Sequence, residues 1–140
     1  MKYSFEMTTK ATPEEIWHNY SDVQKWFIWE ADLLDIKLDG PFQTGVFGEM
    51  TLEGMPPLAF ELVEVLDHRS FCDVTKIPGI GSLYFNHELI PTVQGTVIKH
   101  SVELVCIADN EEEKQLSFLT QVFSDVPQAI FSLAKASVKS

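Results

Sequence analysis

The chain has 140 residues, of which 45% are apolar and 22% charged, and its 10 Lys plus Arg against 21 Asp plus Glu give a formal net charge of −11. This length and composition are typical of one globular domain with a sizeable core and argue against a disordered protein. The excess of carboxylates argues against nucleic-acid binding, which needs a basic face. Residues 1–140 are therefore predicted to form a single domain.

The sequence also predicts where the protein is found. No apolar run approaches the roughly 18–20 residues of a membrane-spanning helix, and the N-terminus lacks the apolar core of a signal peptide. Cys72 and Cys106 lie in separate strand-like segments without a CxxC motif, so buried reduced thiols are expected. We expect a cytoplasmic monomer or homodimer that has no membrane span and binds no cofactor.

The first part of the chain predicts one strand and two short helices. Residues 2–9 alternate between apolar and polar side chains, as in a half-buried strand. Residues 12–15 (Thr-Pro-Glu-Glu) combine an N-cap, a Pro at the first helical position and acids in the first turn. A short helix is expected from there to Tyr20, followed by a second short helical segment that carries Trp26.

The middle of the chain predicts an antiparallel sheet. From about residue 32 the apolar period becomes two, and Leu34, Ile36 and Leu38 are expected to share one face of a strand. We expect the acids of this segment to lie on the solvated face of the strand or at its end; they are Asp32, Asp35 and Asp39. Further strands, separated by turns rich in Gly and Pro, are predicted at about 44–52, 58–66, 69–76, 82–91 and 95–107. Consecutive strands without intervening helices favour antiparallel pairing.

The apolar period changes again near Asp109, where the acids at 111–113 indicate a helix start. Apolar residues then recur at helical spacing from Leu116 almost to the C-terminus, and Pro127 is expected to kink the helix after Ser124. The order of elements predicts an α+β fold in which one sheet curls around a long C-terminal helix. Such an arrangement can leave a cavity between the sheet and the helix.

Several short motifs follow one another along the chain in the same order as these elements. The last of these features is Pro127 in the terminal helix. The motifs are residues 11–17 (Ala-Thr-Pro-Glu-Glu-Ile-Trp), 38–42 (Leu-Asp-Gly-Pro-Phe), 77–79 (Ile-Pro-Gly), 85–89 (Phe-Asn-His-Glu-Leu) and 95–97 (Gly-Thr-Val). Together they resemble the polyketide cyclase/dehydrase branch of the START/Bet v 1-like (SRPBCC) superfamily over essentially the whole chain. The resemblance implies a helix-grip fold, in which a curved seven-stranded antiparallel sheet wraps around the C-terminal helix and encloses an apolar cavity.

The resemblance also implies a class of function. Members of this superfamily bind lipids, sterols, hormones, polyketides and other hydrophobic molecules, and some catalyse cyclisation or dehydration. The implied function is the binding of a hydrophobic or aromatic small molecule, lipid- or polyketide-like, in the internal cavity. Two alternatives stay open, namely a cyclase- or dehydratase-type enzyme and a protein-interaction module like the Hsp90-activator relatives of the superfamily.

Two histidines are the main candidates for polar chemistry. His87 and His100 fall on the apolar faces of consecutive predicted strands. If residues 92–95 form the hairpin loop, the two histidines oppose each other with Cβ atoms about 4.5–5.5 Å apart. They would then orient a ligand, act as acid and base in the enzyme alternative, or only line the cavity. A metal site is not expected, because Cys106 lies roughly 20 Å along the strand from His100.

The other candidate ligand-binding residues are apolar, and two of them, Met55 and Ile80, lie at the tips of loops expected to border the cavity mouth. The full apolar set is Trp29, Met55, Phe60, Leu62, Ile80, Phe85, Val102, Leu119 and Phe123.

Overall fold

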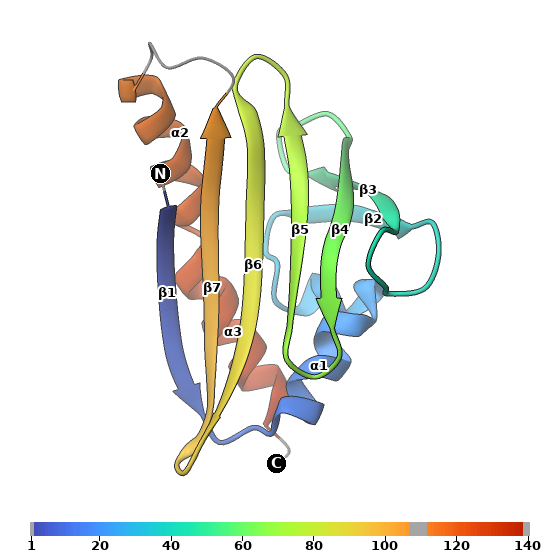
Figure 1. The fold of residues 1–140 in the computed structure, drawn as a ribbon, viewed down its shortest axis with the longest axis vertical. Coiled ribbons are helices and arrows are strands. Elements are labelled where there is room, and N and C mark those ends of the chain that lie inside the picture. Colours follow the sequence, from blue (N-terminus) through green and yellow to red (C-terminus); the bar gives the residue numbers. More distant parts are fainter. Residues whose placement is uncertain (1, 107–111, 139–140) are drawn as a thin grey trace.

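The computed structural model of the protein describes residues 2–106 and 112–138, with only the backbone described at Cys106 and at residues 112–115. The elements, which Figure 1 labels, are β1 (Lys2–Thr9), α1 (Pro13–Ser21), the 3-10 helix η1 (Val23–Ile28), β2 (Leu33–Leu38), β3 (Phe47–Leu52), β4 (Leu58–Leu66), β5 (Ser70–Ile77), β6 (Gly81–Thr92), β7 (Gly95–Cys106), α2 (Glu112–Phe123) and α3 (Val126–Ser137). The predicted helix start at residues 109–111 and the side chain of Cys106 lie outside the described residues.

The strands form one seven-stranded antiparallel sheet in the order β1-β7-β6-β5-β4-β3-β2. Strands β2 and β3 run across the direction of the others, and the C-terminal helix lies behind β1, β7 and β6 in Figure 1. Helix α3 packs on β1 and β7, and α2 packs on β7. The predicted α+β helix-grip arrangement, with two short helices after the first strand, is confirmed.

The two short helices begin where the sequence predicts. The Thr12 hydroxyl accepts a hydrogen bond from the Glu15 backbone N–H at 3.2 Å, and the Glu15 carboxylate accepts one from the Thr12 N–H at 2.9 Å. This capping box satisfies two backbone donors at the start of α1. At its far end the Asn19 amide donates to the Ser137 hydroxyl at 2.9 Å, which joins α1 to the last turn of α3.

The long C-terminal helix consists of two segments. Helix α2 ends at Phe123 and α3 begins at Val126, so the interruption follows Ser124 as predicted. Pro127 lacks a backbone N–H and therefore cannot continue the hydrogen-bond ladder of α2. The buried face of α3 carries small and branched apolar residues that pack on the sheet. None of the described helices is long and apolar enough to cross a membrane.

The prediction for one strand face is wrong at Leu34. This side chain is 60% exposed, whereas Leu33 and Ile36 are buried. The pairing of β2 with β3 shifts register between Leu33 and Asp35. Such an irregularity adds one residue to the strand, so the residues before it switch faces relative to simple alternation.

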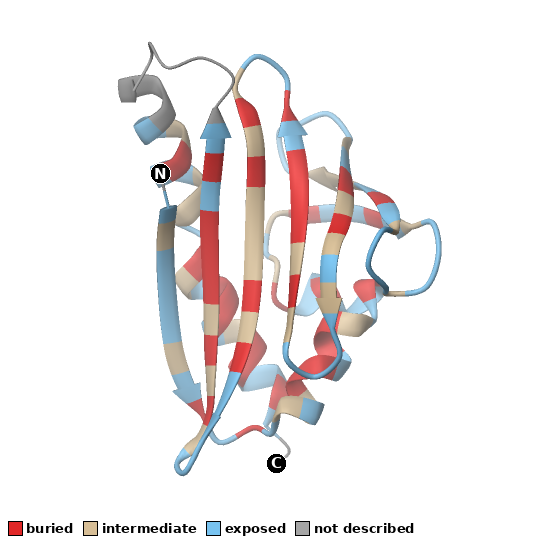
Figure 2. Ribbon diagram, in the orientation of Figure 1, coloured by how far each residue is buried: buried red, intermediate tan, exposed pale blue. Residues whose placement is uncertain are grey.

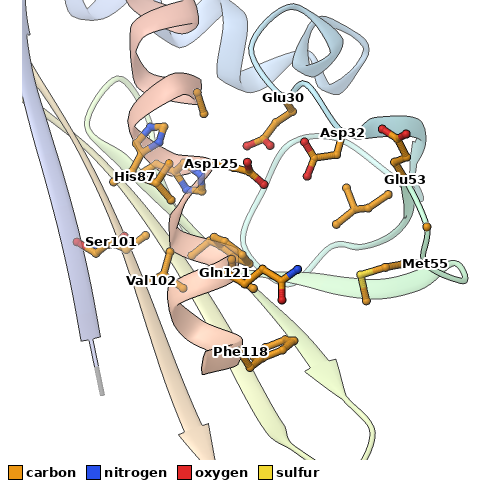
Figure 3. Close-up of a pocket in the computed structure, with 18 residues that line it drawn as sticks. Glu30, Asp32, Glu53, Met55, His87, Ser101, Val102, Phe118, Gln121 and Asp125 are labelled. Atoms are coloured by element: carbon orange, nitrogen blue, oxygen red, sulfur yellow. The ribbon is translucent and has the colours of Figure 1, made fainter. Parts of the chain in front are cut away.

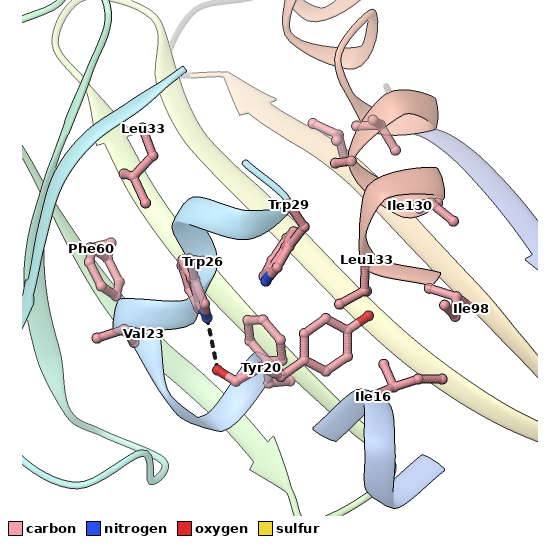
Figure 4. Packing of buried hydrophobic residues seen from close by; sticks show 14 of the residues in the cluster. Ile16, Tyr20, Val23, Trp26, Trp29, Leu33, Phe60, Ile98, Ile130 and Leu133 are labelled. Atoms are coloured by element: carbon pink, nitrogen blue, oxygen red, sulfur yellow. Dashed lines mark hydrogen bonds between the residues drawn. The ribbon is translucent and has the colours of Figure 1, made fainter. Parts of the chain in front are cut away.

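Buried residues concentrate on the central strands and on the inner face of α3, whereas β1 is mostly exposed (Figure 2). Near α1 and η1 the core becomes aromatic, and Figure 4 shows Tyr20, Trp26 and Trp29 side by side. The Trp26 indole N–H donates to the Tyr20 carbonyl at 2.8 Å, and the Trp29 indole N–H donates to the Asn19 carbonyl at 3.1 Å. These bonds hold Trp26 and Trp29 against the sheet, beside the cavity described below.

Candidate functional site

A cavity lies between the sheet and the C-terminal helix (Figure 3). It consists of a larger hollow of about 390 Å³ and an adjoining smaller hollow of about 120 Å³. Glu30, Phe85 and His87 line both hollows. The larger hollow also borders the break between α2 and α3 at Asp125, and both hollows reach the β3–β4 loop at Met55.

The structure brings about half of the sequence-predicted site residues to this cavity. Those that line it are Trp29, Met55, Phe85, His87, His100 and Val102. The others lie elsewhere, with Phe60, Leu62 and Leu119 packed in the core and Ile80 half-buried in the β5–β6 turn. Phe123 packs edge-on against Tyr3, with ring centroids 5.3 Å apart. Strand alternation identified the inward face, but it could not show which inward side chains are covered by others.

The two predicted histidines do oppose each other. His87 pairs with His100 in the β6–β7 register, and their ring centroids lie 4.6 Å apart with an interplanar angle of 71°. The His87 Nδ1–H donates to the Phe71 carbonyl at 3.2 Å, and the His87 ring stacks on the Phe71 ring at 3.9 Å. The His100 Nε2 is hydrogen-bonded to the Tyr20 hydroxyl at 2.7 Å, a partner that the sequence analysis missed. Each imidazole is thus held by its own partner.

Burial controls the charge of both imidazoles. It lowers the pKa of His87 to about 3 and, together with the neighbouring His87, lowers the pKa of His100 well below its ordinary value. A buried imidazole loses hydration that would stabilise its charged form. Both rings are therefore neutral at neutral pH, and because the His87 Nδ1 carries the proton that it donates to Phe71, its Nε2 is unprotonated and has the character of an acceptor.

The Tyr20–His100 bond leads to a stability prediction. Tyr20→Phe should lower the free energy of unfolding by about 1–3 kcal/mol, because it leaves a buried His100 nitrogen without its partner. The matched control is Tyr3→Phe, since the Tyr3 hydroxyl only makes an exposed 3.5 Å contact with Thr120. Urea unfolding should show a change within about 0.5 kcal/mol for this control. Equal losses in the two variants would contradict a specific role for the Tyr20 hydroxyl.

Five carboxyl groups also line the cavity, and none of them was predicted as a site residue. Glu30 borders both hollows, Asp32, Glu53 and Asp125 border the larger one, and Asp73 borders the smaller one. Figure 3 shows Glu30, Asp32 and Asp125 grouped on one side of the larger hollow. Asp32 directly precedes β2, which begins at Leu33, so it lies at an end of the strand as expected, but it also lines the larger hollow.

Burial raises the pKa values of the inner acids. It raises the pKa of Asp73, which is 4% exposed, to about 8. It also raises the pKa of Glu30 to about 8, with smaller contributions from the charges of Asp32, Asp73 and Asp125. The pKa of Asp125 is raised by desolvation and by its hydrogen bond with the Asp32 carboxyl group. The cavity thus contains groups that change charge near neutral pH, and these are acids rather than histidines.

One of these acids could have been found in the sequence. The inward face of β5 carries every second residue, namely Phe71, Asp73, Thr75 and Ile77. The alternation therefore places Asp73 on the same inward face as the apolar Phe71 and Ile77. Glu30 follows the end of η1 and belongs to no periodic segment, so no sequence pattern indicated its position.

The sequence matches no family model and no curated protein, but solved structures match over nearly the whole chain. The protein MLL2253 of Mesorhizobium loti aligns with a TM-score of 0.77 at 14% identity, over 97% of this chain and 96% of that one. The chain has a helix-grip fold. A truncated norcoclaurine synthase of Thalictrum flavum aligns with a TM-score of 0.75 at 13% identity, over 100% of this chain and 94% of that one. The di-domain ARO/CYC StfQ of the steffimycin biosynthetic pathway aligns with a TM-score of 0.78 at 11% identity, over 96% of this chain and 49% of that one.

These neighbours share the architecture that the sequence resemblance implied. The cavity of this chain lies between the curved sheet and the terminal helix, where the resemblance implied one. Within residues 2–106 and 112–138, no three His, Cys, Asp or Glu side chains are grouped as a metal site.

Proposed function

We propose that the protein binds a hydrophobic or aromatic small molecule, lipid- or polyketide-like, in the cavity between the sheet and the C-terminal helix. The cavity itself carries this proposal, because a hollow of about 390 Å³ beside the core is within the range of small-molecule sites. Part of the cavity wall is apolar and is formed by the side chains of Phe85, Val102 and Phe118. The neutral imidazole of His87 offers an acceptor that would orient a polar group of the ligand.

An enzyme of the cyclase or dehydratase type is the second candidate. The opposed His87 and His100 favour it, and so do the names of two neighbours, a synthase and an ARO/CYC protein. However, a histidine whose pKa is about 3 is neutral at neutral pH, so it has no imidazolium form to act as a general acid and is a weak general base. Binding is therefore the preferred function. A protein-interaction module needs no internal cavity, so this third candidate is not favoured.

The cytoplasmic location and the monomeric or homodimeric state of the protein stay predictions.

A substitution that fills the cavity tests this proposal. Ala129 lies on α3 and lines the larger hollow, so Ala129→Phe should occupy the space that the ligand needs. The matched control is Ala136→Phe, which places the same ring on the exposed side of the same helix. Native mass spectrometry of the purified proteins should detect bound small molecules in the wild type and in the control, and about tenfold less in Ala129→Phe.

The ligand can be identified from the same samples by organic extraction. Equal retention of the extracted compounds by Ala129→Phe and Ala136→Phe would show that they bind outside the cavity. If circular dichroism shows that Ala129→Phe is unfolded, Val102→Phe on β7 gives an independent obstruction of the same hollow. Binding that survives both obstructions would contradict the proposed function.

A further inference from the structure

The charge of the cavity differs from that of an ordinary lipid-binding site. Five acids line it, namely Glu30, Asp32, Glu53, Asp73 and Asp125, and none of the described residues that line the two hollows is a lysine or an arginine. The buried imidazoles add no positive charge, because their burial keeps them neutral. A ligand that enters this cavity therefore meets acidic groups that have no cationic partner there.

A second observation points to a missing hydrogen-bond donor. Thr75 is 1% exposed and lines the smaller hollow, yet within the described residues its hydroxyl oxygen has no hydrogen-bond partner. Asp73 lies two residues earlier on the same face of β5 and lines the same hollow. Buried polar atoms are nearly always paired, so an unpaired one beside a hollow calls for an explanation. A ligand group with several N–H donors would supply the partner.

We infer that the ligand is a hydrophobic amine whose ammonium group lies in the smaller hollow against Glu30 and Asp73, with the Thr75 hydroxyl as its third acceptor. This inference rests on the proposed function and deepens it by naming the class of ligand. A primary ammonium group has three N–H donors and no acceptor, which matches two carboxylates and one free hydroxyl.

The division of the cavity fits such an amphipathic ligand. The smaller hollow, of about 120 Å³, holds Glu30, Asp73 and Thr75, and it is large enough for a head group. The larger hollow, of about 390 Å³, is the place for the apolar part, beside Phe85 and Val102. Since Glu30 and Phe85 border both hollows, one molecule can occupy the two together.

Other occupants fit the same acids less well. A calcium or magnesium ion takes six or more oxygen ligands, whereas the described residues contain no group of three or more His, Cys, Asp or Glu side chains that could hold a metal ion. A fatty acid would add a further acid to the site, and its carboxylate could lie beside Glu30 and Asp73 only while both stay protonated, because like charges at close range repel strongly in a buried site. A neutral alcohol would avoid this repulsion, but it would gain no charge-assisted hydrogen bond.

Three probes that share one ring and differ in charge test the inference. They are 1-naphthylmethylamine, 1-naphthylmethanol and 1-naphthoic acid, each titrated calorimetrically into the 140-residue chain at pH 7. We expect the amine to bind at least about tenfold more tightly than the alcohol and the alcohol more tightly than the acid. The amine should also release protons, because an ammonium group favours the ionised forms of Glu30 and Asp73, whose pKa values of about 8 leave them protonated at pH 7.

Proton release distinguishes this site from apolar binding elsewhere. Titrations in phosphate and in Tris, which differ in ionisation enthalpy, should give about one proton or more released per amine bound and none for the alcohol. The variants Glu30→Gln and Asp73→Asn should each weaken amine binding about tenfold or more and change alcohol binding less than twofold. The control is Glu49→Gln, which removes one charge from the exposed side of β3 and should leave both affinities unchanged.

The possible failures are distinguishable. If the alcohol binds as tightly as the amine, the amine inference is overturned while the proposed function stands. If Glu49→Gln weakens amine binding as much as Glu30→Gln does, the effect comes from net charge and the assigned site is wrong. If no naphthyl probe binds but extraction yields a ligand without an amine, the inference fails alone. The proposed function fails only if bound ligands resist both Ala129→Phe and Val102→Phe.

Discussion

Between about pH 6.5 and pH 8 the free energy of unfolding should fall as the pH rises, by about 1.4 kcal/mol per pH unit for each of two acids. The acids are Asp73 and Glu30, whose pKa values burial raises from 3.8 and 4.5 to about 8. In this pH range the folded protein keeps both protons and the unfolded chain has lost them. The folded state therefore binds more protons, and raising the pH favours unfolding.

The histidines act in the opposite direction at lower pH. Burial lowers the pKa of His87 from 6.5 to about 3 and also lowers that of His100. Below pH 6.5 the unfolded chain gains protons on these rings and the folded protein does not, so their contribution to stability is lost as the pH falls. Between about pH 4.5 and 6.5 the two effects offset each other. Stability should be greatest in that range.

Asp73→Asn isolates the contribution of one acid. It keeps the size of the side chain and removes its ionisation, so the slope above pH 6.5 should be about half that of the wild type. Asp39→Asn is the matched control, because Asp39 is exposed just after β2 and its replacement should leave the slope unchanged. Urea unfolding at half-unit intervals from pH 5 to pH 9 gives the slopes. A wild-type slope of zero, or one unaffected by Asp73→Asn, would show that Asp73 ionises normally in the folded protein.

The second large effect separates a binding protein from an enzyme. In a binding protein, His87→Ala and His100→Ala should each weaken ligand binding by about 1 kcal/mol, the contribution of one neutral hydrogen bond. In an enzyme that uses the pair as acid and base, either change should lower turnover by about 10²–10⁴-fold and leave binding largely intact. Affinity and turnover measured with the extracted ligand distinguish these outcomes.

The matched control for the histidine variants is His18→Ala, because His18 is exposed on α1 and does not line the cavity. Circular dichroism should accompany each variant, since His87 stacks on Phe71 and His100 is bonded to Tyr20. If neither histidine variant alters binding or turnover while both remain folded, the two imidazoles only line the cavity. A large loss of turnover in either variant would make the enzyme the preferred function.

Much of the site geometry could be predicted because it follows from local rules. The alternation of β6 and β7 placed His87 and His100 on inward faces, and the length of the hairpin loop determined that they oppose each other. Pro127 likewise determined where the terminal helix is interrupted, because a residue without an N–H cannot continue the ladder. Such features depend on a few neighbouring residues, so a single sequence is enough to predict them.

The character of the cavity was decided by the tertiary structure. The sequence by itself determined the strands, the helices, the opposed histidines and the inward side of β6 and β7, whereas the register shift in β2 made its predicted face wrong at Leu34. Only the packing of distant segments decided that Phe60 and Leu62 are covered while Glu30 and Asp73 border the hollow. Only that packing brought Tyr20 to His100, 80 residues later in the chain. The physical reason is that periodicity sets the direction of a side chain, whereas its solvation and its partners depend on which remote residues fill the space in front of it.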